Sequence, residues 1–306
     1  MSEQEFNIKN AVSGVLVIDK PVGMTSHDVV QVVRRGTGIR RAGHTGTLDP
    51  RASGVLVVLV GPAVRLSEFV SASDKRYQAI IRLGESTDTF DGDGEVTGRK
   101  AVNITQEEIE AALTQFEGTV EQVPPAYSAK KINGQKAYEL ARKGEEVELE
   151  AKEIDVYHLE LLEWDSPEAI IDVYCSSGTY VRSLANDLGE VLDCGGHLVG
   201  LRRTKSGEFA LRDAIQLRKL EEAFENGDWY KYLIPAAEAL SDWPSRELSF
   251  DEVDLVRHGH RVPVEEVPEN PDHWVRAISQ QGELVALLEY LPEEKEWQPR
   301  KVFFTQ

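Results

Sequence analysis

The sequence predicts an α+β fold, in which helices and strands are mixed along the chain and a β-rich segment ends it. Short apolar runs of strand length, at residues 14–18 and 54–60, alternate with amphipathic stretches of helical length. Polar and apolar side chains alternate through residues 147–163 and 168–175, which is typical of antiparallel neighbouring strands. From Trp243 onward, closely spaced prolines separate short strand-like segments.

Local patterns place the individual elements. Ser26 is the predicted N-cap of a helix over residues 27–35, which Gly36 and Gly38 end. Thr105 and Glu108 form a capping box before a helix that runs to Phe116. Further predictions are a short helix at 64–70, a strand at 77–83, a helix at 136–143, a helix after Thr179 with Leu184, Leu188, Val191 and Leu192 inward, a strand after Gly196, a helical region at 216–240, and tail strands at 274–279, 284–290 and 301–304.

The chain of 306 residues suits one large domain and one small domain, or two domains of ordinary size. The change in composition near residues 240–247 predicts a boundary there, which gives domains at 1–242 and 243–306. The longest apolar run is too short to cross a bilayer, and the acidic N-terminus has no signal-peptide core. We therefore expect a cytoplasmic protein with no membrane partner.

The charge distribution bears on the class of partner. The net charge of −19 argues at face value against nucleic acid. Residues 1–100, however, carry 13 Lys/Arg and 12 Asp/Glu, so the excess acid lies later in the chain. Basic side chains cluster locally, at 34–41, 75–76, 130–131 and 202–205. Because phosphate binding requires local positive potential rather than a positive total, a nucleic-acid partner remains compatible with this composition.

Metal binding is not expected. Cys175 and Cys194 do not have the spacing of metal ligands and fit a reducing compartment. The segment at residues 87–95 is similar to a calcium loop, but Thr89 and Lys100 stand where carboxylate ligands are required. An Asp/Gly turn is the better interpretation of this segment.

The most informative stretch is Gly43-His44-Thr45-Gly46-Thr47-Leu48-Asp49-Pro50. Pro50 fixes its own φ and biases Asp49 towards an extended conformation, directly before the apolar run at residues 54–60. The pattern predicts a rigid loop that presents one carboxylate beside a buried strand. The alternative is an ordinary turn, because Asp-Pro is a common way to begin one.

Arg182 occupies an unusual place, in the first turn of the helix predicted after Thr179. A cation there opposes the positive end of the helix dipole, so an anion is needed nearby. We expect Arg182 to pair with Asp49; the alternative is a surface arginine that bends back to solvent.

Several motifs, taken together and in order, resemble bacterial TruB-type tRNA pseudouridine synthases. They lie at residues 14–21 with 23–26, 43–50, 74–77, 82–84 with 87–89, 124–129, 178–182 and 201–204. The resemblance covers about residues 14–235, and the tail is similar to the small PUA-like module of the same family.

The resemblance implies isomerisation of uridine to pseudouridine at position 55, in the TΨC loop of tRNA, with no metal and no organic cofactor. It implies a pseudouridine-synthase fold with a mixed, mostly antiparallel central sheet, an RNA-gripping insertion at about 124–152 and a β-rich PUA-like tail. Asp49 falls at the catalytic carboxylate and Arg182 at its partner. The base-contacting positions are His44, Tyr77, Tyr180 and Leu201, and Lys20 falls in the family's Lys-Pro pair.

The chemistry explains these residue types. The target base must leave its stack, which costs a few kcal/mol; stacking on Tyr77 can recover part of this cost, and His44 can fill the gap. Asp49 then acts as nucleophile at C1′ or as base at C2′, and both roles require the ionised carboxylate. The proton on C5 leaves to Tyr77 or to water. For both Tyr77 and Tyr180, packing in the core is the alternative role.

Three other functions are alternatives to this one. A guide-RNA-directed relative shares the Asp loop, but the stretch from Lys20 to Ser26, the short tail and the lack of Lys-rich ends favour a stand-alone enzyme. An RNA-folding helper could use the same surface without chemistry, and a small-molecule enzyme is favoured only by the acidity. We expect a monomer that binds the T arm of tRNA without a guide RNA.

Overall fold

The computed structural model describes residues 12–125, 131–132, 135–136, 149–264, 267–268, 270 and 273–303. The predicted helix at 136–143 lies outside the described residues, apart from its first residue, which belongs to a short strand. The chain divides into two compact units. Unit 1 is Met1–Asp49, Leu56–Ser71 and Asp213–Gln306, and unit 2 is Pro50–Val55 and Ala72–Arg212.

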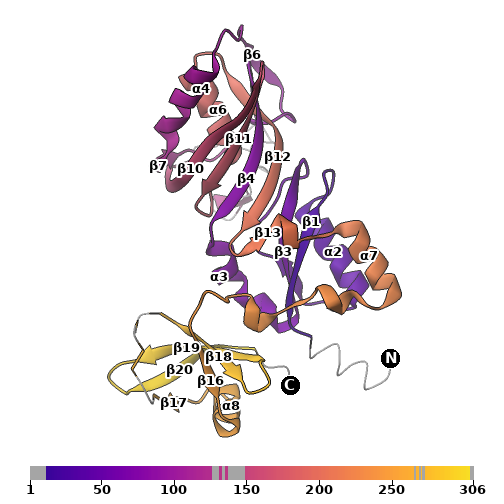
Figure 1. Ribbon diagram of the computed structural model, residues 1–306, viewed down its shortest axis with the longest axis vertical. Helices are drawn as coiled ribbons and strands as arrows, with labels where there is room; N and C mark the ends of the chain where they lie inside the picture. Colours follow the sequence, from indigo (N-terminus) through magenta and orange to yellow (C-terminus); the bar gives the residue numbers. More distant parts are fainter. Residues whose placement is uncertain are drawn as a thin grey trace. The chain divides into compact units, whose positions relative to one another are not determined.

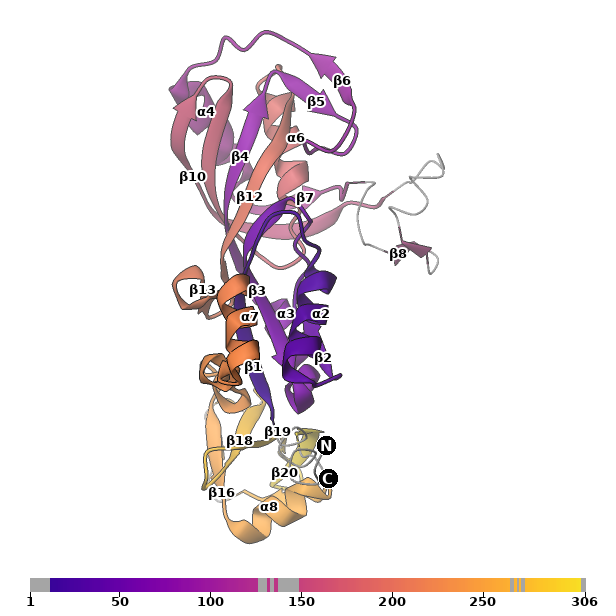
Figure 2. The ribbon, with the colours of Figure 1, turned by 90° about the vertical axis from the view of Figure 1, so that its right-hand side faces the viewer.

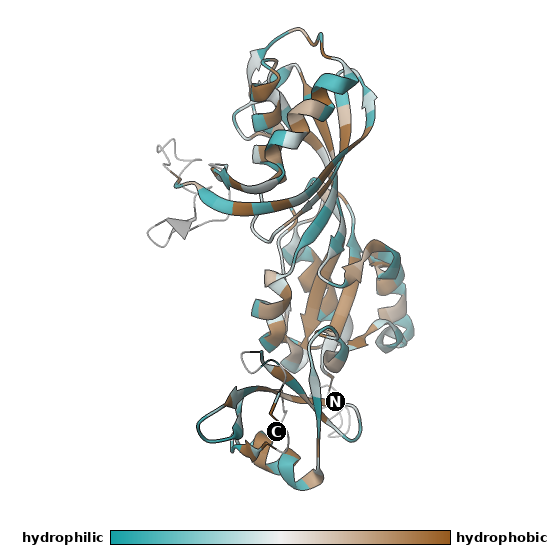
Figure 3. Cartoon of the chain, turned by 60° about the vertical axis from the view of Figure 1, so that its left-hand side comes forward, coloured by the Kyte–Doolittle hydropathy of each residue, from teal (hydrophilic) through white to brown (hydrophobic). Residues whose placement is uncertain are grey.

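Unit 1 is built on strands that are apolar along most of their length. Strand β1 has six buried residues of seven, and β3 is buried at every position but Ser53, so these strands are brown in Figure 3. The strand order is β14-β1-β3; β14 runs parallel to β1, whereas β15 pairs antiparallel with β1 and β2 with β3. The elements are β1 (Gly14–Lys20), α2 (Ser26–Thr37), β2 (Ala42–His44), β3 (Ala52–Val60, shared with unit 2), η1 (Gly61–Leu66), α3 (Ser67–Ala72, whose last residue is in unit 2), η3 (Leu211–Asp213, shared with unit 2), β14 (Ile215–Gln216), α7 (Leu217–Asn226), η4 (Trp229–Tyr232), β15 (Ile234–Pro235) and η5 (Ala236–Glu238).

Helix α2 differs from its prediction at both ends. Its N-cap is Thr25, whose hydroxyl accepts from the N–H of Asp28 at 3.1 Å in a capping box, so Ser26 as N-cap is wrong. Gly36 does not end the helix. Instead it allows α2 to lie against the ring of Phe224 on α7, since a Cβ atom at this position would come to 2.1 Å from that ring. The helix ends after Thr37, and Gly38 (φ 70°) caps it in the left-handed region. Figure 1 shows α2 beside α7.

The helical region predicted at 216–240 is only partly helical. Helix α7 ends at Asn226, because Gly227 adopts the left-handed conformation (φ 74°), and 3₁₀ turns and a short strand follow.

The tail of the chain forms the predicted β-rich module, in strand order β16-β18-β19-β20-β17 (Figure 2). Its elements are β16 (Ser245–Leu248), α8 (Phe250–Arg257), β17 (Val262–Pro263), β18 (Val275–Ser279), β19 (Leu284–Leu291) and β20 (Glu296–Val302). Strands β18 and β19 match their predictions, whereas β20 begins five residues before the strand predicted at 301–304. Helix α8 was not predicted, although Ser249 and Glu252 form its capping box.

Unit 2 is a mostly antiparallel sheet in the order β12-β4-β11-β10-β7, with the first residues of β3 parallel to β12 (Figure 1). The predicted mixed, mostly antiparallel sheet is therefore confirmed. The elements are β4 (Lys75–Leu83), β5 (Glu85–Thr87), β6 (Val96–Arg99), α4 (Gln106–Leu113), η2 (Thr114–Phe116), β7 (Gly118–Gln122), β8 (Lys131–Ile132), β9 (Gln135–Lys136), β10 (Lys152–Asp165), β11 (Glu168–Cys175), α6 (Val181–Val191), β12 (Gly196–Ser206) and β13 (Phe209–Ala210).

Helices α4 and α6 pack against this sheet and against each other. Leu184 and Leu188 of α6 are buried as predicted, but Val191 is 46% exposed, so its inward placement is wrong. The chain turns back at Gly195 and Gly196, which contact α6 at Gly189, and Val191 lies beyond this contact in the last turn. No helix in the described ranges is long and apolar enough to cross a bilayer.

Candidate active site

Lys20 organises the turn between β1 and α2 in unit 1. Its side chain is fully buried, and its ammonium group donates hydrogen bonds to the carbonyl oxygens of Pro21 (2.9 Å) and Met24 (2.6 Å). A buried ammonium group needs such acceptors because desolvation is otherwise costly. Lys20 therefore fixes the backbone that leads into α2.

Ser26 joins the start of α2 to the loop that carries Asp49. Its buried hydroxyl accepts from the N–H of Leu48 at 2.8 Å and donates to the carbonyl of Leu48 at 3.0 Å. At the other end of the loop, the N–H of Thr45 donates to the carbonyl of Val57 at 3.1 Å. The loop is thus held on both sides of Gly46 and Thr47, and Asp49 directly follows the anchored Leu48. This agrees with the rigid loop predicted from the sequence.

His44 is the last residue of β2 and lies opposite Val58 of β3. It precedes the anchored Thr45, so its backbone position is fixed by the same pairing. Lys20, His44 and Asp49 all belong to unit 1.

In unit 2, Arg182 forms an ion pair with Asp91, with 3.0 Å between Nη1 and Oδ2. The two side chains are only 11% and 16% exposed, so this pair is more shielded than a surface salt bridge. The anion required by the position of Arg182 at the start of α6 is therefore present. The predicted pairing of Arg182 with Asp49 stays a prediction.

The loop between β5 and β6 holds Asp91 in place. The carboxylate of Asp91 accepts from the hydroxyl of Thr89 at 2.6 Å and from the N–H of Asp93 at 3.0 Å. The loop also pairs with β12, because Gly92 donates to the carbonyl of Leu198 and Leu198 donates to that of Phe90, both at 3.0 Å. Sequence reasoning treated this segment as a turn and missed Asp91. The signal that could have identified it is the carboxylate that Arg182 requires.

The remaining predicted site residues lie on neighbouring elements of unit 2. Tyr77, on β4, is 9% exposed and lies opposite Arg203 of β12. Tyr180 is the N-cap of α6, and its backbone N–H donates to the amide oxygen of Gln122 at 2.8 Å. Leu201, on β12, lies directly opposite Ala52, three residues after Asp49 in the chain.

Two buried cations lie near Tyr77. Burial, together with the neighbouring charge of Arg203, lowers the pKa of Lys75 to about 8. Arg203 is itself 2% exposed and donates to the carbonyl of Val55 at 2.7 Å. These two cations lie on the neighbouring strands β4 and β12, with the carboxylate of Asp74 close to Lys75.

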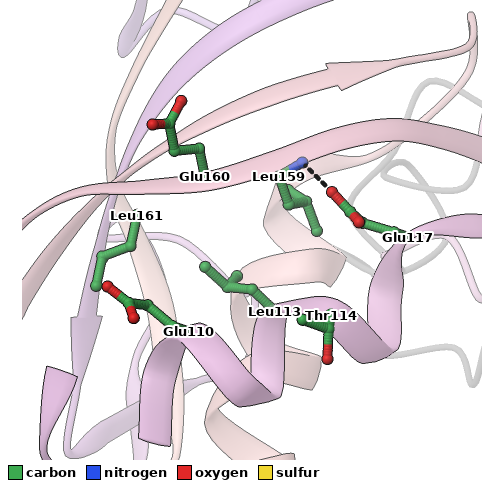
Figure 4. Close-up of a pocket in the computed structure, with 7 residues that line it drawn as sticks. All are labelled: Glu110, Leu113, Thr114, Glu117, Leu159, Glu160 and Leu161. Atoms are coloured by element: carbon green, nitrogen blue, oxygen red, sulfur yellow. Dashed lines mark hydrogen bonds between the residues drawn. The ribbon is translucent and has the colours of Figure 1, made fainter. Parts of the chain in front are cut away.

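A separate concavity of about 240 Å³ lies in unit 2 (Figure 4). Carboxylates of Glu110, Glu117 and Glu160 surround its apolar floor, and Glu117 accepts from the N–H of Leu159 at 2.9 Å. Like charges would repel a phosphate there, and none of the predicted site residues lines it. No cluster of three or more metal-ligating side chains occurs in the described part of the chain.

Comparison with known proteins gives consistent matches. The family "TruB family pseudouridylate synthase (N terminal domain)" matches residues 34–181, and "tRNA pseudouridylate synthase B C-terminal domain" matches residues 182–241. The chain is 42% identical over 287 residues to tRNA pseudouridine synthase B of Pseudomonas aeruginosa (strain UCBPP-PA14), which covers 93% of this chain and 94% of that protein. It is 48% identical over 263 residues to the protein of the same name from Symbiobacterium thermophilum, covering 85% and 86%.

Solved structures agree with these matches. "Structure of H/ACA RNP bound to a substrate RNA containing 2'-deoxyuridine" matches with a TM-score of 0.75 and 26% identity, over 99% of this chain and 88% of that chain. "Crystal Structure of a Cbf5-Nop10-Gar1 Complex" matches with a TM-score of 0.74 and 27% identity, over 99% and 88%. The class of protein is thus a pseudouridine synthase, an isomerase. Within this class, the chain belongs to the TruB family.

Proposed function

We propose that this enzyme converts uridine-55 in the T arm of tRNA to pseudouridine. The observation that carries the proposal is the anchored loop, in which Ser26 holds Leu48 and thereby fixes the backbone directly before Asp49. Relatives that share 42% and 48% of their aligned residues with this chain bear the name tRNA pseudouridine synthase B, which supports tRNA as the substrate.

The reaction assigns a role to each residue. The flipped uracil stacks on Tyr77, and Tyr180 and Leu201 contact the base, while His44 fills the gap left in the RNA. Asp49 attacks C1′, or removes a proton from C2′, as the C1′–N1 bond breaks. After the uracil rotates, a C5–C1′ bond forms while the Asp49 carboxylate leaves C1′ in the first path, or while the proton returns to C2′ in the second. The C5 proton then leaves to a base such as Tyr77 or water.

Arg182 orients Asp49 and stabilises its ionised form in this proposal. Asp91 in turn sets the direction of the guanidinium through the 3.0 Å ion pair. Lys20 fixes the turn at Pro21 to Met24, which leads into α2 in the unit that carries Asp49.

The enzyme acts as a cytoplasmic monomer without a guide RNA in this proposal. Residues 1–242 form the catalytic domain, the insertion at about 124–152 grips the RNA, and residues 243–306 form a PUA-like module. The enzyme's own chemistry requires no metal or organic cofactor, because the carboxylate supplies the nucleophile or base.

The test is to incubate the purified protein with a tRNA transcript alone and to map pseudouridine by mass spectrometry of nuclease fragments. We expect one pseudouridine at position 55, and none in a transcript with cytidine at that position. Modification only after a second RNA is added, or modification at another position, would contradict the proposal.

A further inference from the structure

Three arginines at the C-terminal end of α2 differ from the other arginines of this acidic chain. Arg35, Arg40 and Arg41 are exposed, and within the described residues their side chains make no hydrogen bond or ion pair. They lie within seven consecutive positions, in the part of the chain where acidic and basic residues balance.

Every other arginine in the described ranges takes part in a polar or electrostatic contact. Arg99, Arg218 and Arg300, which are also exposed, pair with Glu85, Glu222 and Glu289. The arginines of the C-terminal module pair likewise with carboxylates or donate to carbonyl oxygens. Cations already neutralised in this way gain little from a phosphate, because an existing partner must first be lost.

The backbone that carries the three arginines is fixed. The hydroxyl of Thr37 donates to the carbonyl of Val33 at 2.7 Å and accepts from the N–H of Ile39 at 3.1 Å. Thr37 and Ile39 are 4% and 7% exposed, so they anchor the turn in the core. The carbonyl of Arg41 accepts from the N–H of Gly61 at 2.7 Å. A pre-formed turn lowers the entropic cost of binding a ligand.

Arg34 contributes to this anchoring rather than to the free cluster. It is in the last turn of α2 and donates from Nη2 to the carbonyl of Ala42 at 2.7 Å. Its guanidinium therefore holds the end of α2 against the start of β2. In the chain, Arg35 directly follows Arg34, and Arg40 and Arg41 directly precede Ala42.

The turn leads directly into the Asp49 loop. Arg41 precedes β2, which ends at His44, so the Cα atoms of Arg41 and His44 are at most about 10 Å apart. Both residues belong to unit 1. Guanidinium groups bind phosphate in bidentate fashion and are weakly hydrated, which suits them to an RNA backbone.

We propose that Arg35, Arg40 and Arg41 form a phosphate-binding site that holds the T-arm backbone of tRNA beside the Asp49 loop. This inference rests on the proposed function, because it takes tRNA as the substrate. The site explains how an enzyme with a net charge of −19 binds a polyanion: the unpartnered arginines of the described residues are gathered on one fixed turn.

The test compares two variants with equal net charge. In R35Q/R40Q/R41Q the proposed site is removed, whereas in R99Q/R218Q/R300Q three paired arginines are removed. The dissociation constant for an unmodified tRNA transcript is measured by fluorescence anisotropy over a range of KCl concentrations. Single-turnover rates are measured at saturating enzyme, and circular dichroism confirms folding.

Each lost phosphate contact lowers the slope of log Kd against log[KCl] by about 0.7–0.9. For R35Q/R40Q/R41Q we expect a slope reduced by about two and binding at roughly 0.1 M salt weakened about tenfold or more, with a smaller effect on the saturating rate than on affinity. For R99Q/R218Q/R300Q we expect a slope close to that of the native protein.

The outcomes separate the two claims. If the native protein binds and modifies the transcript, but both triple variants have the same slope and affinity, the phosphate site is refuted and the proposed function stands. A native protein that neither binds nor modifies the transcript refutes the proposed function, and the phosphate site with it.

Discussion

At the scale of the residue, Arg182 forms an ion pair with Asp91, and in the proposed function it also orients the carboxylate of Asp49. Arg182 lies at the start of a helix, where its charge is unfavourable, and Asp91 compensates for it from a loop 91 positions earlier. The sequence predicted that Arg182 needs an anion, because this follows from local helix geometry. It did not identify Asp91, because the contact depends on how the loop pairs with β12.

We predict that Asp91→Asn lowers kcat by about ten- to a hundredfold, since a hydrogen bond to a charged group contributes about 1.5–3 kcal/mol. Asparagine keeps the shape but not the charge that orients the guanidinium. Single-turnover kinetics with saturating enzyme measure the effect. Asp93→Asn, in the same loop but exposed and paired with Arg51, is the matched control and should keep a rate near native. Equal rates for the two variants would contradict the role given to Asp91.

Lys75 gives a prediction for pH dependence. Its pKa is about 8 in the folded protein, against an ordinary value of 10.5, chiefly because burial disfavours the charged form. Between these two pH values the unfolded chain binds more protons than the folded one, so the stability contributed by this group rises with pH. Below pH 8 both states are protonated and the cost of burying the charge is present in full.

Lys75→Met removes this titration. The stability of the native protein relative to the variant should therefore rise from pH 8 to 10, with a slope of up to about 1.4 kcal/mol per pH unit. Urea denaturation at several pH values measures the difference. A flat difference for Lys75→Met would show that its ammonium group is not destabilised by burial.

At the scale of the element, adjacent hydroxyls at the start of α2 have different roles. Thr25 caps the helix, whereas Ser26 bonds the backbone of Leu48, 22 positions later. Helix-capping rules accept either residue, and only the tertiary contact decides between them. The helix was therefore predictable from its sequence, but its first residue and its link to the Asp49 loop were not.

This difference can be measured with two alanine variants. Thr25→Ala should lower the unfolding free energy by about 1 kcal/mol, the typical value of an N-cap, and leave kcat unchanged. Ser26→Ala leaves buried polar groups of Leu48 unpaired and should cost about 1–3 kcal/mol. It should also lower kcat, because the backbone before Asp49 loses its anchor. If both variants keep native kcat, the loop does not depend on Ser26.

The strands were predicted more accurately than the ends of the helices. Runs such as residues 54–60 are apolar throughout, so their burial follows from composition alone. Helix α7 and the end of α6 were misjudged because Gly227, Gly195 and Gly196 redirect the chain through conformations and close contacts that periodicity does not reveal.

At the scale of the whole molecule, total charge was a poor guide to the class of partner. The chain carries 53 acidic and 34 basic residues, yet the ion pairs of the described residues neutralise most arginines and leave one free cluster near the Asp49 loop. The family could be identified because several motifs occur in order. The side-chain contacts that support those motifs required the structure.

The most direct test of the central claim is release of tritium from a tRNA transcript that contains 5-tritiated uridine, measured for the native protein and for Asp49→Asn. Formation of the C5–C1′ bond expels the label, so release reports the isomerisation itself. We expect release by the native protein and none above buffer by Asp49→Asn, with both proteins folded and both binding the transcript. Equal release by the two proteins would show that the carboxylate of Asp49 does not carry the reaction.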